Sequence, residues 1–258
     1  MREQIIEKIK LVESQFDVRV CLAVESGSRA WGFSSENSDY DVRFIYVHKR
    51  DWYLSIEQKQ EVIELPIQDF VDMSGWELRK ALRLYKKSNP HILEWIHSEI
   101  VYYQVPAFLD KMLELEDMIL LPQSVLYHYL NMAKRNSRDF IRGETVKVKK
   151  YLNVLRPVLA CKWIERFNTV PPIELQVLID KFIDEGRLKH EIQVLLARKI
   201  SGDKDPFELK LDYIDEYMAK EIHRLEEYVK TLVVSKEDAT QLLDDLFRNI
   251  LDEAWTEK

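Results

Sequence analysis

Apolar and polar positions in the first hundred residues follow patterns that predict a small sheet with flanking helices. Residues 2–13 carry apolar side chains three and four positions apart, which is typical of an amphipathic helix. Short and mainly apolar runs predict extended segments at 18–24, 41–47, 62–71 (interrupted at Pro66) and 101–103. A short helix is expected to start near Ser28, and 33–38 reads as a polar loop.

Helix signals dominate from residue 74 onward. Ser74 and Glu77 fit a capping box, so a helix is predicted from about 75 to 87, and Pro90 starts another. Further helical periodicities follow at 109–118, 125–141, 146–166, 173–185, 188–199 and 213–234, with a second capping box at 235–238 before the last helix. The pattern predicts an α/β head at 1–105 and an all-helical domain at 106–258.

Two acids at the start of a predicted strand follow a glycine-serine turn. Asp39 and Asp41 are two residues apart, so on an extended strand both side chains project from one face. Two adjacent carboxylates repel each other unless a cation lies between them, and such hard oxygen ligands suit Mg²⁺ or Mn²⁺. Backbone amides of the turn at Gly27 and Ser28 are suited to phosphate oxygens. The pattern therefore indicates a site for a nucleoside triphosphate (NTP) bound with a divalent metal.

Composition agrees with an intracellular enzyme. The 258 residues are 46% apolar and 32% charged, and no run approaches the length of a membrane span. Acids within the first ten residues argue against a signal peptide, and Cys21 and Cys161 show no metal-ligand spacing. The net charge of −7 argues against a protein that coats nucleic acid, although 134–166 is locally basic. We predict a cytoplasmic protein that does not enter a membrane.

Several motifs together resemble one protein family. They are ESGSRAWGF at 25–33, DYDVRF at 39–44, DMSGWELRKAL at 72–82, SNP at 88–90 and EW at 94–95. They are similar to the RlaP-like predicted nucleotidyltransferases associated with RNA repair, within the DNA polymerase β-like superfamily. The similarity is strong over 18–103, fainter over 149–157 and slight after about 175. It implies a polymerase β-like head with a mixed sheet.

Two-metal phosphoryl transfer usually needs a third carboxylate, and two residues are candidates. Asp69 has the apolar flanks that are generic for such an acid, whereas Asp72 precedes the Gly75-Trp76 pair by three residues, as in the RlaP-like pattern. If both lie on one extended strand, they face opposite ways. We prefer Asp72 as the third metal ligand and the carboxylate that helps to activate the attacking hydroxyl, and Asp72 as a helix cap is the structural alternative.

Basic residues beside the motifs are candidates for the triphosphate. Arg29 follows the phosphate turn, where it either reaches a triphosphate or pairs with Glu25. Arg43 shares the predicted face of Asp41, where it either contacts a phosphate or neutralises the acids. Related nucleotidyltransferases supply a lysine and a tyrosine from the second domain, and this resemblance points to Lys149 and Tyr151.

The sequence predicts a Mg²⁺-dependent nucleotidyltransferase that moves a nucleoside monophosphate to an acceptor hydroxyl and releases pyrophosphate. The resemblance implies an RNA end as the acceptor, with damaged tRNA as one candidate. Two alternatives stay open: transfer to a protein or small molecule, and a non-catalytic nucleotide-binding module.

Overall fold

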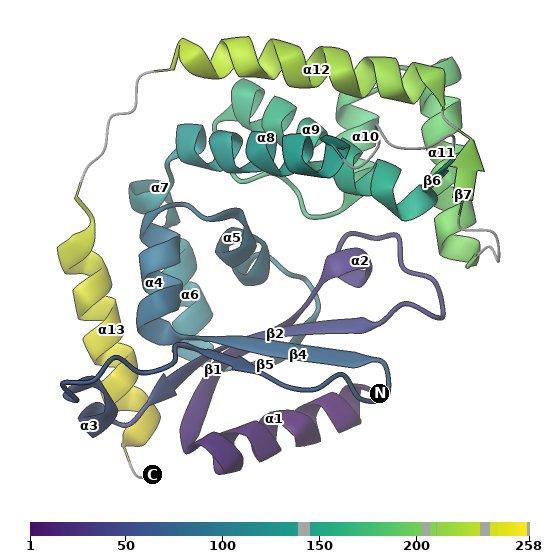
Figure 1. Cartoon of the computed structure of the whole chain (residues 1–258). Helices are drawn as coiled ribbons and strands as arrows, with labels where there is room; N and C mark the ends of the chain where they lie inside the picture. Colours follow the sequence, from purple (N-terminus) through teal and green to yellow (C-terminus); the bar gives the residue numbers. More distant parts are fainter. Residues whose placement is uncertain (139–144, 203–206, 210, 233–237, 257–258) are drawn as a thin grey trace. The chain divides into compact units, whose positions relative to one another are not determined.

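A computed structural model describes residues 1–138, 145–202, 207–209, 211–232 and 238–256, and these form two compact units (Figure 1). The first unit comprises Met1–Ala30, Asp39–Leu120 and Lys236–Lys258, and the second comprises Trp31–Ser38 and Leu121–Ser235. The units interleave along the chain, whereas the predicted domains 1–105 and 106–258 divide it once. Those domain ranges stay a prediction.

The first unit is built on a mixed sheet of five strands in the order β3-β4-β2-β1-β5. Every neighbouring pair is antiparallel except β2 and β4, which run parallel. The predicted mixed sheet is therefore confirmed. The strands are β1 (Val18–Ser26), β2 (Tyr40–His48), β3 (Val62–Glu64), β4 (Val71–Glu77) and β5 (Val101–Gln104).

Helices cover both faces of this sheet. Helix α1 lies on one face, where Ile5, Ile9 and Val12 pack into a core with Phe44 and Met73. Helices α4, α5 and α6 lie on the opposite face, and α13 packs against α4, β1 and β2 (Figure 1). The helices of this unit are α1 (Arg2–Phe16), α2 (Gly27–Ala30), α3 (Arg50–Tyr53), α4 (Leu78–Lys86), α5 (Pro90–Ile96), α6 (Pro106–Glu114), α7 (Glu116–Ile119) and α13 (Thr240–Trp255).

A glycine in β4 leaves room for a buried ring of the neighbouring strand. Phe44 of β2 is the register partner of Gly75 of β4. A Cβ on Gly75 would lie 2.2 Å from the Cε2 atom of Phe44, so a larger residue there would displace this buried ring. The fit of Gly75 to Phe44 therefore supports the β2–β4 register.

The predicted capping box at Ser74 is wrong, because β4 continues through Ser74 to Glu77. Helix α4 begins at Leu78, and the buried Glu77 side chain caps it by accepting the N–H groups of Arg79 at 2.8 Å and Lys80 at 3.1 Å. The strand ladder with β2 extends as far as Glu77, so pairing overrides the local helix signal. The second predicted capping box falls partly outside the described residues, and Asp238 accepts the N–H of Thr240 there.

The second unit is largely helical. Helix α9 packs against α8, α10, α11 and α12. The prediction of an all-helical domain needs correction, because β6 and β7 form an antiparallel pair that joins residues far apart in sequence. Its elements are α8 (Pro122–Arg138), β6 (Thr145–Lys147), α9 (Val148–Phe167), α10 (Leu175–Phe182), α11 (Arg187–Ser201), β7 (Phe207–Leu209) and α12 (Asp212–Lys230).

A stacked histidine at the end of β2 gives the first unit a testable pH dependence. The His48 ring stacks on Trp52 with centroids 4.2 Å apart, and the His48 carbonyl accepts the indole N–H of Trp255. Burial lowers the pKa of His48 from 6.5 to about 4, with a contribution from the positive charge of Lys59 and an opposing one from Asp17. The folded protein therefore takes up this proton less readily than the unfolded chain does.

We expect the His48 contribution to stability to be lost as pH falls from about 6.5 to about 4. His48→Phe keeps an aromatic ring but removes the titrating group. Between pH 7 and pH 5 the wild-type protein should therefore lose on the order of 1 kcal/mol more unfolding free energy than the variant. Urea unfolding at both pH values measures this difference. Equal losses in the two proteins would contradict the assignment.

Candidate functional site

The predicted phosphate turn lies where β1 ends and α2 begins. Gly27 has a φ of +61°, a conformation that favours glycine. A Cβ at this position would lie 2.1 Å from Oδ2 of Asp41, so the Asp41 carboxylate lies directly against the turn. Ser28 is 6% exposed within α2. The structure therefore brings the glycine-serine turn and one of the predicted acids into contact.

The two predicted acids of the strand differ in their surroundings. Asp41 lies in β2, paired with Ser26 of β1 on one side and with Asp72 of β4 on the other. Asp39 is exposed and precedes β2, so strand alternation does not fix the direction of its side chain. The expectation that both acids lie on one face therefore stays a prediction for Asp39.

The third-carboxylate candidates are also separated by the fold. Asp72 lies in β4 beside Asp41, because the parallel strands pair these two residues in register. Asp69 lies outside β4 in a tight turn with a φ of 54°, where it is exposed. The assumption that both lie on one strand is wrong, although the geometry favours Asp72 for the same site as Asp41.

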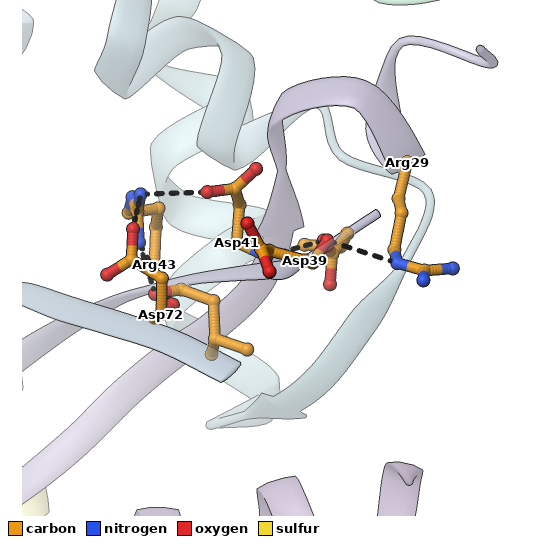
Figure 2. Close-up of polar contacts among 7 residues, drawn as sticks. Arg29, Asp39, Asp41, Arg43 and Asp72 are labelled. Carbon is orange, nitrogen blue, oxygen red and sulfur yellow. Dashed lines mark hydrogen bonds and ion pairs between the residues drawn. The ribbon is translucent and has the colours of Figure 1, made fainter. Parts of the chain in front are cut away.

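Arg43 joins the two neighbouring carboxylates (Figure 2). Its Nη2 atom donates to Oδ1 of Asp41 at 3.2 Å and to Oδ2 of Asp72 at 2.8 Å. Its Nη1 atom donates to the carbonyl oxygens of Val42 and Asp72, each at 3.1 Å. The side chain is only 19% exposed. In this arrangement Arg43 neutralises the acids, which is one of its two predicted roles.

Arg29 contacts the segment that precedes β2. Its Nε atom donates to the carbonyl of Asp39 at 3.2 Å, and its guanidinium lies 3.7 Å from the centroid of the Tyr40 ring (Figure 2). Its positive charge also acts to lower the pKa of Glu25. Arg29 is therefore held next to Asp39 at the edge of the site.

A buried carboxylate beneath the site escaped the sequence reasoning as a functional residue. Glu25 is 1% exposed, and its carboxylate accepts the backbone N–H of Asp41 at 2.8 Å and the hydroxyl of Tyr102 at 2.5 Å. The Ser98 hydroxyl donates to the Glu25 carbonyl at 2.7 Å. Burial raises the pKa of Glu25, while the two bonds to its carboxylate act to lower that pKa. The available signal was an acid directly after the apolar run 20–24, because buried acids require partners.

The predicted residues of the helical region belong to the second unit. Lys149 is exposed near the start of α9. Tyr151 is buried, and its hydroxyl accepts the N–H of Leu211 at 2.9 Å. Burial of Tyr151 therefore opposes a triphosphate contact by this hydroxyl. The roles of both residues stay predictions.

The carboxylates fit a divalent metal by chemistry. Asp41 and Asp72 offer hard oxygen donors at paired positions, and both reach the same nitrogen of Arg43. Within the described residues, however, no three Asp, Glu, His or Cys side chains form a ready ligand group. A metal at the pair would lie next to the positive charge of Arg43, which bonds to one oxygen of each carboxylate.

Comparison with known proteins places the chain in a family. Residues 1–249 match the family described as "RlaP: RNA repair pathway DNA polymerase beta family". The chain belongs to this family. The family assignment made from the motifs is therefore confirmed. The match extends well beyond residues 18–103, where the motifs are most similar.

Relatives of this RlaP-family chain include one with high identity. "Uncharacterized protein YcgL" of Bacillus subtilis (strain 168) is 48% identical over 255 residues, which cover 99% of this chain and 98% of that protein. A crystal structure of a nucleotidyltransferase-like protein from Exiguobacterium sibiricum 255-15 has 10% identity and a TM-score of 0.33, covering 96% of this chain and 87% of that one. This score is too low to carry an argument. Among the described helices, none combines the length and apolar character needed to cross a membrane.

Gly27→Ala should separate backbone strain from the contact with Asp41. Both Gly27 and Gly202 have left-handed φ angles, but a Cβ at Gly202 would lie no closer than 3.5 Å to its neighbours. Gly202→Ala should therefore cost roughly 1 kcal/mol of stability, and Gly27→Ala clearly more because it must also displace the Asp41 carboxylate. Urea unfolding of both variants tests this. Equal losses of unfolding free energy in the two variants would show that the Asp41 carboxylate does not lie against the turn.

Proposed function

We propose that this RlaP-family protein transfers a nucleoside monophosphate from an NTP to an acceptor hydroxyl. The observation that carries the proposal is the pairing of Asp41 with Asp72 directly beside the Gly27 turn. The acceptor oxygen would form a bond to the α-phosphorus as the bond between that phosphorus and the bridging oxygen breaks. Pyrophosphate then leaves, and the acceptor's proton is lost.

Asp39, Asp41 and Asp72 are the proposed metal ligands. When Mg²⁺ or Mn²⁺ is bound, it supplies charge neutralisation on the phosphate oxygens and lowers the pKa of the attacking hydroxyl. Asp41 and Asp72 are already paired through strand register, so their backbone needs no rearrangement. The exposed Asp39, directly before β2, is proposed to complete the set.

The nearby polar groups are assigned to the triphosphate. Gly27 and Ser28 lie beside Asp41, where their backbone could approach phosphate oxygens closely. Arg29 lies next to Asp39 and offers a positive charge at the edge of the site. The exposed Lys149 is a further candidate for the triphosphate. The buried Tyr151 would join it only if its hydroxyl became accessible to a phosphate oxygen.

An RNA end is the proposed acceptor, and a damaged tRNA is one form of it. The support is the family description, which names an RNA repair pathway. No residue assigned so far recognises a particular base. Transfer to a protein or a small molecule, or nucleotide binding without catalysis, are the alternatives that the experiment must separate. A cytoplasmic location stays a prediction from composition.

Incubation with each of four α-labelled NTPs, Mg²⁺, total RNA and lysate protein tests the proposal. We expect label in RNA, and an Asp39→Asn/Asp41→Asn variant should lose at least ~10²-fold in labelling because metal ligands are removed. Its stability should change by no more than about 1 kcal/mol, since asparagine still accepts a bond from Arg43.

The control is Asp51→Asn with Glu57→Gln, two exposed acids beyond the far end of β2. It should label RNA like the wild-type protein. Label in protein alone would favour the alternative acceptor. Absence of any label would favour the binding module.

The choice between Asp72 and Asp69 makes a separate prediction. Asp72→Asn should slow the single-turnover rate by at least ~10²-fold, because Asp72 shares the site of Asp41. Asp69→Asn should be near normal in rate and stability, because asparagine tolerates the left-handed turn conformation. Rapid-quench kinetics and melting temperatures of both variants decide it. An inactive Asp69→Asn beside an active Asp72→Asn would reverse the assignment.

A further inference from the structure

The proposed metal position already contains a cation from the chain itself. One nitrogen of Arg43 bonds to a carboxylate oxygen of Asp41 and to one of Asp72 (Figure 2). The second terminal nitrogen is fixed by the carbonyls of Val42 and Asp72. With four acceptors and low exposure, the guanidinium is held in place rather than extended toward solvent.

Electrostatics explains why a cation is needed there. Asp41 and Asp72 are register partners on adjacent strands, and like charges at paired positions of neighbouring strands repel each other. Their partial burial strengthens this repulsion relative to open water. The Arg43 guanidinium offsets the charge of both acids and fixes their orientation.

The same contacts exclude a metal at those oxygens. Mg²⁺ binds carboxylate oxygens directly at about 2.0–2.1 Å and demands near-octahedral geometry. An oxygen that already accepts a guanidinium N–H cannot be approached in this way by a second cation without displacing the first or facing its repulsion. Arg43 bonds to one oxygen of each carboxylate, and a metal at the second oxygen would still face the repulsion of the guanidinium charge. Metal binding at Asp41 and Asp72 is therefore favoured when Arg43 releases at least one carboxylate.

We propose that Arg43 is an internal counter-ion that competes with the metal for Asp41 and Asp72. This inference rests on the proposed function, because it concerns the metal ligands assigned there. The metal-free protein is stabilised by Arg43, so a divalent ion alone binds weakly. A metal that arrives with a triphosphate binds better, because the displaced guanidinium gains phosphate oxygens as new acceptors. The two roles expected for Arg43 are then successive states of one side chain.

Arg43→Gln tests the competition in the absence of nucleotide. Binding of Mn²⁺ to the full-length protein, followed by the electron paramagnetic resonance signal of unbound Mn²⁺, should tighten at least ~10-fold in the variant. The melting temperature in excess chelator should fall, because the two acids lose their counter-ion. An affinity that is unchanged or weaker in Arg43→Gln would overturn the proposal.

Matched variants separate competition from a general effect of charge. Arg29→Gln removes a nearby positive charge that bonds to the backbone carbonyl of Asp39, so it should change Mn²⁺ affinity less than Arg43→Gln does. An equal gain in Arg29→Gln and Arg43→Gln would also overturn the proposal. Arg43→Lys keeps one charge without the guanidinium fork and should bind Mn²⁺ with intermediate affinity, which provides a second measurement if Arg43→Gln folds poorly.

The test of the competition, which measures Mn²⁺ binding, can fail or succeed independently of the test for nucleotide transfer. Tighter Mn²⁺ binding in Arg43→Gln that disappears when Asp72→Asn is added supports the competition, even if no nucleotide transfer is found. Nucleotide transfer by the wild-type protein without a change of Mn²⁺ affinity in Arg43→Gln leaves the function standing and overturns the competition.

Discussion

The parallel pairing of β2 with β4 is the constraint on which the candidate site depends. It sets Asp41 beside Asp72, and a shift of one residue would turn one of them to the opposite face. The register is stabilised on the face of the sheet opposite the two carboxylates, where Phe44 and Met73 pack in the core with α1. Gly75 contributes by leaving room for the Phe44 ring. Hydrophobic packing on one face thus fixes the spacing of the carboxylates on the other.

A buried acid supports the strand entry that carries Asp41. Glu25 binds the Asp41 backbone from β1 and is itself held by Tyr102 of β5, so three strands meet at one carboxylate. Burying a carboxylate is unfavourable unless it is well bonded, which is why its partners matter. Glu77 acts similarly at the other end of the sheet, where its carboxylate caps α4 and accepts the hydroxyl of Tyr53. Both buried carboxylates accept backbone N–H groups and so hold the neighbouring backbone in place.

The sequence predicted the head of the molecule better than its polar details. Apolar periodicity located α1, β1 and β2, because these elements bury one face in a core. It failed at Ser74, where a good local cap signal lies inside a strand that long-range pairing stabilises. Residue spacing could not place Asp39 or Asp69, because each lies just outside the strand that the argument assumed. The strand pair β6–β7 joins positions about sixty residues apart and leaves no local pattern.

The order of the elements in the chain has a consequence for folding during synthesis. Helix α13 packs against α4, β1 and β2, yet the whole of the second unit from Leu121 to Ser235 is translated before it. The surfaces that α13 covers, including the His48 carbonyl bonded by Trp255, are therefore complete only when α13 itself has been made. Until then the nascent first unit exposes apolar surface on α4 that a chaperone can bind. Helix α13 thus completes a unit whose other segments are translated before the second unit is finished.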